Sequence, residues 1–139
     1  MIYVTIQFVC IIWLALHCSI AQLQAVHLLI LLIAVFIGIW AVISMRPGNI
    51  NIVPALKENH NLVTTGIYGY IRHPMYTSVI LFCAVMLATQ VTWIDSLVFV
   101  FLLIDLWLKL QHEEHLLCER FPEYRDYQKR TKMMIPFVV

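Results

Sequence analysis

The sequence predicts an all-α membrane protein: a polytopic helical bundle with about four transmembrane helices, forming a single domain over residues 1–139. Three observations support this prediction. Hydrophobic residues make up 62% of the chain, charged residues make up only 12%, and the apolar residues fall in long runs. Soluble domains carry roughly 25% charged residues, so this chain cannot cover itself with a polar surface. The net charge of +1 favours no charged partner, so membrane lipids are the expected surroundings and no nucleic acid is expected to bind.

The first two predicted spans cover residues 2–21 and 25–45. Each is free of Asp, Glu, Lys and Arg and has the length of about 20 residues that a helix needs to cross ~30 Å of hydrocarbon. The short connection 22–24 predicts an antiparallel hairpin of these two helices. We do not expect residues 1–21 to be a cleaved signal peptide, because they lack a basic n-region and their apolar run is longer than a usual h-region.

A polar loop over residues 46–76 precedes two further predicted spans, at about 76–91 and 94–110. The loop begins at Arg46-Pro47-Gly48, a combination that stops a helix. The fourth helix is predicted to continue beyond the membrane to Phe121, within a C-terminal helix and tail over residues 111–139.

The placement of basic residues orients these spans. All nine Lys and Arg residues lie at Arg46 or later, in the 46–72 region and from Lys109 onward. With four spans, the loop and the tail share one side of the membrane, which the positive-inside rule makes cytoplasmic. We therefore expect a cofactor pocket, formed by the 46–76 loop and the C-terminal tail, that faces the cytosol. The membrane would be the inner membrane in a bacterium and the endoplasmic reticulum in a eukaryote.

The end of the polar loop contains residue types suited to binding an anion. Gly66 and Gly69 allow a close approach of the backbone to a ligand, and Pro74 suits the first turn of the third span. Arg72 and His73 then lie at a helix N-terminus, where unpaired N–H groups and the helix dipole attract a carboxylate or phosphate. Arg72 can add a bidentate clamp. The alternative is that Arg72 contacts anionic lipid headgroups.

A second polar segment, Glu113-Glu114, follows the fourth span by one turn. A solvated helix face would explain such a pair, but the aromatic tail that follows it could cap a pocket at the membrane surface. A glutamate under that cap could accept two ribose hydroxyls or pair with an ammonium group. Tyr68, Tyr70 and Tyr76 could form walls and hydrogen-bond partners for a planar ring.

Together these segments resemble the isoprenylcysteine carboxyl methyltransferase family. The resemblance covers roughly the C-terminal 80 residues. Its most specific part is the pattern His-x-Leu-Val-Thr-x-Gly-x-Tyr-x-x-x-Arg-His-Pro-x-Tyr from His60 to Tyr76, followed by Glu113-Glu114 and by Phe121-Pro122-Glu123-Tyr124. Phospholipid N-methyltransferases and membrane sterol reductases share a looser version of this pattern.

The resemblance implies a helical membrane enzyme that uses S-adenosylmethionine to methylate a membrane-embedded or lipid-like acceptor, such as the carboxylate of a prenylated cysteine. The implied cofactor-binding residues are His60, Asn61, Leu62, Val63, Tyr68, His73, Pro74, Met75, Tyr76 and Glu113. The implied catalytic residues are Arg72, Lys109 and Glu114, and no metal is expected. The eukaryotic members hold the substrate carboxylate with an Arg at the position of Lys109. Because Lys lacks the planar fork of Arg, the identity of the acceptor stays open.

The chemistry that fits is an in-line displacement at the sulfonium methyl group, in which positioning does most of the work. A carboxylate acceptor is already a nucleophile at neutral pH, and Arg72 or Lys109 would hold it. An amine or thiol acceptor would need a base, for which His112, His115 and Glu114 are the candidates.

Two alternative enzyme classes share some of these features. A membrane reductase of the sterol-reductase type would bind an NAD(P)H cofactor at a similar Arg-His-Pro loop. A metal enzyme could use His112 and His115, which lie at i and i+3 on one helical face, together with His60 and His73.

A non-enzymatic four-helix membrane subunit or small transporter is the third alternative. Asp105 lies within the fourth predicted span, and an acidic side chain inside the membrane is a functional candidate. A hydrogen bond from Ser44, Thr77 or Ser78 would instead give Asp105 a purely structural explanation.

Overall fold

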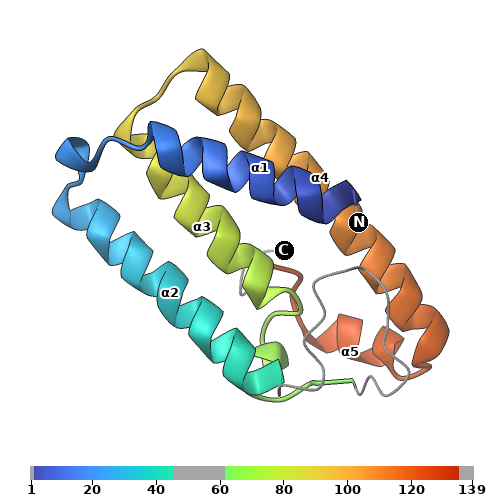
Figure 1. The fold of residues 1–139 in the computed structure, drawn as a ribbon. Coiled ribbons are helices and arrows are strands. Elements are labelled where there is room, and N and C mark those ends of the chain that lie inside the picture. The colour runs from blue at the N-terminus through green and yellow to red at the C-terminus, as the bar shows by residue number, and fades with distance from the viewer. Residues whose placement is uncertain (1, 46–61, 135–139) are drawn as a thin grey trace.

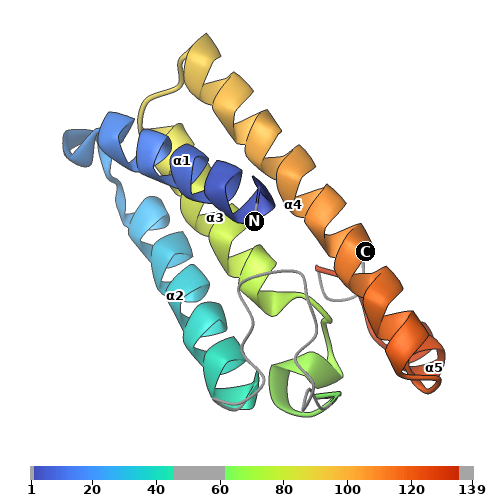
Figure 2. The ribbon, with the colours of Figure 1, turned by 45° about the vertical axis from the view of Figure 1, so that its right-hand side comes forward.

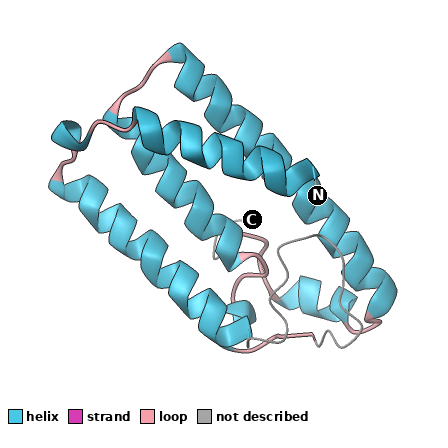
Figure 3. Ribbon diagram, in the orientation of Figure 1, coloured by secondary structure: helices cyan, strands magenta, loops and turns pink. Residues whose placement is uncertain are grey.

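A computed structural model describes residues 2–45 and 62–134 of the chain (Figure 1). The elements in order are α1 (Ile2–His17), the 3₁₀ turn η1 (Ile20–Gln22), α2 (Ala25–Met45), the 3₁₀ turn η2 (Gly66–Gly69), α3 (Pro74–Thr89), α4 (Trp93–Arg120) and α5 (Tyr124–Arg130). Within these residues every regular element is helical (Figure 3), and one isolated parallel bridge joins Ile71 to Lys132. The all-α prediction is confirmed.

Helix α3 lies at the centre of the bundle and contacts α1, α2 and α4. Helix α2 packs mainly against α3, and α1 packs mainly against α4 (Figures 1 and 2). The tight hairpin predicted for the first two helices is therefore wrong. Helix α1 ends at His17 instead of residue 21, because the Ser19 N–H leaves the helix and donates to Thr89 Oγ1 over 3.1 Å. The resulting connection is longer than residues 22–24 and lets α1 pack away from α2.

Small residues bring α2 and α3 close together. Ala34 and Ala41 are buried at this interface, and Gly38 lies between them on the same helical face, as in the small-xxx-small packing of membrane helices. A Cβ on Gly38 would lie 2.8 Å from Ser78 Oγ, while that hydroxyl donates to the Ala34 carbonyl over 2.7 Å. The close contact thus depends on the absence of a side chain at residue 38.

The boundaries of the last two long helices follow local signals. Helix α3 begins at Pro74, because the fixed φ of proline suits the first turn of a helix. It covers Pro74–Thr89, so it begins and ends two residues earlier than the predicted 76–91. The Thr92 side chain accepts the Asp95 N–H over 3.1 Å and caps α4. Helix α4 ends at Arg120, which confirms to within one residue the predicted extension to Phe121.

The outer faces of the bundle are apolar. Exposed side chains include Leu16, Leu32, Ile43 and Phe101, each at least 63% exposed. Among the described helices, α2 alone is both long and apolar enough to cross a membrane by itself, and α1 and α3 are shorter apolar helices of 16 residues. Apolar faces of this extent are characteristic of a surface covered by lipid or by another protein.

Candidate functional site

The turn η2 lies against the end of α2 because residue 66 is a glycine. Gly66 has φ +64°, and a Cβ there would lie 2.4 Å from Ser44 Oγ. A side chain would therefore be both strained and blocked at this position. Next to this contact, Ile67 and Tyr68 are buried and share an apolar cluster with Ala41.

Backbone hydrogen bonds join the end of the polar loop to the C-terminal segment. Arg72 and His73 donate their N–H groups to the carbonyls of Lys132 and Met133 over 2.8 and 3.0 Å, and Lys132 N–H donates to the Tyr70 carbonyl over 3.0 Å. These bonds occupy the two amides that precede α3, where the sequence predicted free donors for an anion. The chain thus brings its two polar segments together at one end of the bundle (Figure 2).

Glu114 of α4 is the centre of a buried hydrogen-bond cluster at this end. Its Oε1 accepts from Arg72 Nε over 2.6 Å and from Tyr124 Oη over 3.4 Å, and lies 3.3 Å from His73 Nε2. Its Oε2 accepts from Gln128 Nε2 over 2.8 Å. The Glu114 side chain is only 10% exposed. One carboxylate therefore holds together the start of α3, the C-terminal part of α4 and helix α5.

The cluster also sets the protonation state of Glu114. Burial by itself raises the pKa of this carboxyl, but the hydrogen bonds with His73 and Arg72 and the charge of Arg72 outweigh burial and lower the pKa to about 2. Glu114 is therefore ionised at neutral pH and is a weak proton acceptor.

Arg72 also makes hydrogen bonds to the backbone through its Nη1 atom. Its Nη1 donates to the Gln128 carbonyl over 3.1 Å and to the Thr131 carbonyl over 2.6 Å. The guanidinium, predicted as a clamp for a bound anion, thus pairs with a carboxylate and two carbonyls of the chain itself.

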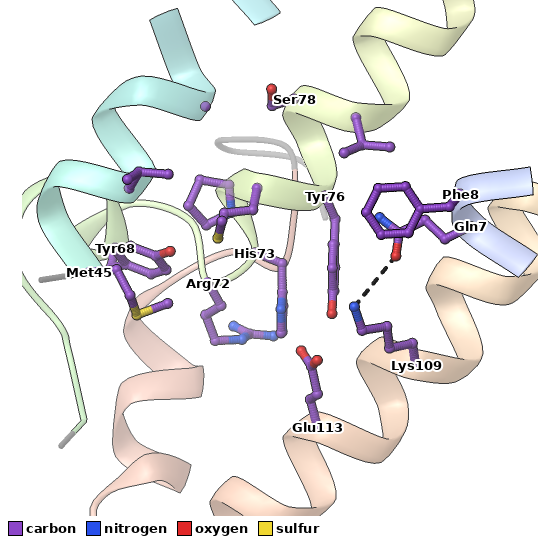
Figure 4. A pocket seen from close by; sticks show the side chains of 15 residues that line it. Gln7, Phe8, Met45, Tyr68, Arg72, His73, Tyr76, Ser78, Lys109 and Glu113 are labelled. Carbon is purple, nitrogen blue, oxygen red and sulfur yellow. Dashed lines mark hydrogen bonds between the residues drawn. The ribbon is translucent and has the colours of Figure 1, made fainter. Parts of the chain in front are cut away.

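A cavity of about 390 Å³ opens beside this cluster (Figure 4). Its walls come from all four long helices and from the η2 turn. Eight predicted site residues line it: Tyr68, Arg72, His73, Pro74, Met75, Tyr76, Lys109 and Glu113. Glu113 lines the cavity, whereas Glu114 belongs to the cluster behind it. The two neighbouring glutamates therefore occupy different environments.

The polar groups at the cavity wall are only partly paired. Tyr68 Oη is buried and has no hydrogen-bond partner among residues 2–45 and 62–134, and burial raises the pKa of this phenol far above its usual range. The ammonium of Lys109 lies 5.1 Å from the centroid of the Tyr76 ring. That ring stacks on His73 at 5.4 Å. Aromatic faces and the Tyr68 hydroxyl thus line the same space.

The remaining predicted residues lie elsewhere. Leu62 and Val63 are half-buried next to η2, and His60 and Asn61 lie outside the described residues. His112 and His115 are exposed on α4, and His115 lies 3.5 Å from Glu119. The described part of the chain contains no group of three potential metal ligands.

Asp105 is buried in the bundle. Two of the three partners considered for it bond elsewhere, since Ser78 donates to the Ala34 carbonyl and Thr77 donates to the Met134 carbonyl. Asp105 Oδ2 has no hydrogen-bond partner in the part of the chain that the structure describes.

Some residues that line the cavity were not predicted from the sequence. They come from α1, α2 and α3: Gln7, Phe8, Gly38, Val42, Met45, Ser78 and Val79. A usable signal existed for Gln7, because a polar amide in the middle of an apolar span is a candidate for a functional or packing contact.

Comparison with known proteins gives a consistent family. The sequence model of the isoprenylcysteine carboxyl methyltransferase (ICMT) family matches residues 25–119. Protein-S-isoprenylcysteine O-methyltransferase B of Arabidopsis thaliana is 30% identical over 87 residues, which are 59% of this chain and 43% of that protein. Protein-S-isoprenylcysteine O-methyltransferase of Saccharomyces cerevisiae is 33% identical over 94 residues, 63% of this chain and 38% of that protein.

A protein named for metal resistance has a similar level of sequence identity to this chain. The nickel-cobalt-cadmium resistance protein NccN of Alcaligenes xylosoxydans xylosoxydans is 33% identical over 84 residues, which are 58% of this chain and 38% of that protein. The matches therefore span less than half the length of each of these three relatives.

Proposed function

Because the chain belongs to the isoprenylcysteine carboxyl methyltransferase family, we propose that it is an integral membrane methyltransferase that uses S-adenosylmethionine and acts on a lipid-like acceptor. The observation that supports this most strongly is the cavity at the end of the bundle, where eight residues implied by the family resemblance meet. They come from two segments that lie more than 30 residues apart in the sequence. Their convergence is expected for a shared binding site.

We place four spans in the membrane: α1, α2, α3 and residues 93–110 of α4. Helices α1 and α3 have 16 residues each and measure about 24 Å at 1.5 Å per residue, somewhat less than the ~30 Å of hydrocarbon. Ile20, Val91 and Trp93 are exposed at the end of the bundle away from the cavity and extend its apolar surface. The basic residues of the described chain gather at the opposite end, and under the positive-inside rule this supports our proposal that the cavity faces the cytosol.

The residues at the cavity fit S-adenosylmethionine by their chemistry. Tyr68 offers a buried hydroxyl that has no partner in the described part of the chain, and such a group is unfavourable unless a ligand pairs with it. The Tyr76 ring offers a face for a planar base. Glu113 offers a carboxylate for ribose hydroxyls or for an ammonium group. When bound, the cofactor supplies an electrophilic methyl group.

Lys109 and the adjoining apolar wall suit the acceptor. The Lys109 ammonium is buried at the cavity wall, where an anionic group such as a carboxylate would be favoured. Phe8, Val42 and Val79 line the same cavity, and Phe8 and Val42 are 53% and 43% exposed on the lipid-facing side. A lipid tail could enter between α1 and α2 and leave its head group at Lys109.

We assign Arg72 and Glu114 to positioning. Their buried ion pair holds the start of α3 against α4, and His73 contacts the same carboxylate. This pairing fixes the ring of His73, against which Tyr76 stacks. Arg72 and Glu114 then affect catalysis by keeping the cavity wall in place, since productive geometry depends on such support.

A methyl-transfer assay tests the proposal. Full-length protein in detergent is incubated with S-adenosylmethionine carrying a labelled methyl group and with N-acetyl-S-farnesylcysteine. We expect label in the organic phase as a base-labile ester. A lipid amine and a lipid thiol serve as alternative acceptors in parallel reactions. Absence of transfer to all three acceptors, by protein that is folded, would contradict the proposal.

A further inference from the structure

The cavity has a polar end and an apolar end. Arg72 of the polar loop and Lys109 and Glu113 of α4 lie at one end, and Ser78 lies at the other end, beyond the Tyr76 ring (Figure 4). Apolar side chains of α1 and α2 line much of the remaining wall. The proposed cofactor, a polar molecule, therefore suits the α4 end, and the apolar wall is left for the acceptor.

The volume of the cavity limits what it can enclose. The cavity measures about 390 Å³, near the lower limit of the roughly 300–1,000 Å³ that sites for drug-sized ligands occupy. S-adenosylmethionine is itself a ligand of that size. Once it is bound, the described walls leave room for a head group but not for the full length of a long hydrocarbon chain.

Contacts close two of the gaps between helices around the cavity. Between α2 and α3, a Cβ on Gly38 would lie 2.8 Å from Ser78 Oγ, so the two helices touch there. Between α1 and α4, Lys109 Nζ donates to Gln7 Oε1 over 3.5 Å, the contact drawn as a dashed line in Figure 4. A hydrocarbon chain has no path through either contact.

The gap between α1 and α2 is different. Helix α1 packs mainly on α4 and α2 packs mainly on α3, and the two helices diverge from the η1 turn toward the cavity (Figures 1 and 2). Phe8 of α1 and Val42 of α2 line the cavity and are still 53% and 43% exposed. These two side chains therefore border both the cavity and the apolar surroundings of the bundle.

An open apolar wall of this kind gives little selectivity between hydrocarbon chains. Lipid tails are as apolar as the exposed side chains, so a chain that moves from the bilayer onto this wall gains little free energy. Discrimination by shape requires side chains that pack closely around the chain. Phe8 and Val42 are too exposed to surround it.

We propose that the cavity encloses only the cofactor and the head group of the acceptor, and that the hydrocarbon chain of the acceptor leaves between Phe8 and Val42 and stays in the bilayer. The inference rests on the proposed function and adds a range of acceptors to it. One head group is methylated whether it carries an isoprenoid chain or an unbranched alkyl chain. The chain holds the acceptor in the membrane without being recognised by its shape.

Two acceptors with one head group test this inference. N-acetyl-S-farnesylcysteine is compared with N-acetyl-S-dodecylcysteine, whose chain has the same main-chain length but lacks methyl branches and double bonds. Each is mixed at the same mole fraction into micelles that contain the full-length protein, and transfer of the labelled methyl group is measured. We expect the two values of kcat/KM to agree within about threefold. A larger difference would overturn the inference.

Val42→Trp tests the path of the chain. A large ring at this position fills the gap between α1 and α2, and we expect kcat/KM to fall by about tenfold or more for both acceptors, with the affinity for S-adenosylhomocysteine unchanged. Ile43→Trp is the matched control, because it adds the same ring at a neighbouring position that is 71% exposed, and it should alter neither acceptor. Unchanged rates in Val42→Trp, or a loss confined to one chain, would contradict the inference.

The pattern of methyl transfer by the wild type separates failure of this inference from failure of the proposed function. Transfer to the farnesyl acceptor alone overturns the inference and leaves the methyltransferase proposal standing. Transfer to neither thioether by folded protein also overturns the inference. The lipid amine and the lipid thiol of the assay above then decide whether the methyltransferase proposal stands.

Discussion

Glu113 and Glu114 are neighbours in the sequence but belong to different parts of the molecule. Successive residues on a helix point about 100° apart, so only one of the two can face the cavity. Glu114 lies in a buried cluster and pairs with Arg72, His73 and Gln128. Glu113 lines the cavity within interaction distance of Tyr76. The Glu114 carboxylate is thus hydrogen-bonded to other side chains, whereas the Glu113 carboxylate faces the cavity.

This difference separates structural roles from binding roles. A carboxylate with several protein donors stabilises the fold, and its removal leaves those donors unpaired. A carboxylate at a cavity wall contributes little to the stability of the unbound protein. Its removal should instead lower the affinity for the ligand. Substitutions in the two regions should therefore affect different measurements.

The largest expected effect is on stability, at Glu114. Glu114→Gln removes the charge opposite Arg72 and should lower the free energy of unfolding by about 3 kcal/mol, the cost of breaking a buried ion pair by removing one partner. Denaturation of the detergent-solubilised protein measures this. Glu113→Gln is the matched control and should stay within about 0.5 kcal/mol of wild type, as expected away from buried networks. Equal losses of stability in the two variants would contradict the different roles of Glu113 and Glu114.

A smaller loss is expected at Arg72. Arg72→Lys keeps the positive charge but cannot reproduce the bonds from Nε to Glu114 and from Nη1 to the carbonyls of Gln128 and Thr131. We expect a loss of about 2 kcal/mol and earlier hydrogen exchange of the amides at 131–133, because the C-terminal segment loses its anchor. Protection of those amides equal to wild type would contradict this role.

The pH dependence of stability should report Glu114. The pKa of Glu114 is lowered in the folded protein to about 2, from an ordinary value of 4.5 for a glutamate side chain. A lowered folded pKa adds stability above the unfolded pKa, and this stability is lost as the pH falls through the folded value. We therefore expect stability to decrease between about pH 4.5 and pH 2, with a smaller slope in Glu114→Gln. Identical slopes in both proteins would assign the acid sensitivity to other groups.

The smallest effect on stability is expected at the cavity wall. Tyr68→Phe removes a buried hydroxyl that has no partner among the described residues. The unbound protein should be unchanged or more stable by up to about 1 kcal/mol, because no hydrogen bond is lost. Affinity for S-adenosylhomocysteine should fall by about threefold to tenfold. A stability loss without any change in affinity would show that this hydroxyl serves the fold.

The sequence predicted the helices and the meeting of the two polar segments well, because long apolar runs and proline boundaries are local signals. Pro74 marked the start of α3, and the positions of the basic residues indicated which ends belong together. The boundary at His17 was missed because it depends on the Ser19 to Thr89 hydrogen bond, a contact between distant residues. No local pattern encodes such a contact.

The pairing of Arg72 with Glu114 instead of Glu113 could not be predicted for the same reason. Both residues follow the fourth span, and the sequence gives no sign of which one meets Arg72. Gln128, which completes the Glu114 cluster, lies in a polar helix without a distinctive motif. Gln7 lies outside the family pattern, and only the packing of α1 on α4 brings it to Lys109.

Calorimetric titration of the detergent-solubilised protein with S-adenosylhomocysteine, on wild type and on Glu113→Gln, tests the account most directly. NADPH titrated into a parallel sample tests the reductase alternative. We expect the wild type to bind the nucleoside and not NADPH, and Glu113→Gln to bind it at least tenfold more weakly, a loss of about 1.4 kcal/mol, while remaining folded. Binding of NADPH alone, or equal nucleoside affinity in the two proteins, would contradict the assignment of the cavity and of Glu113.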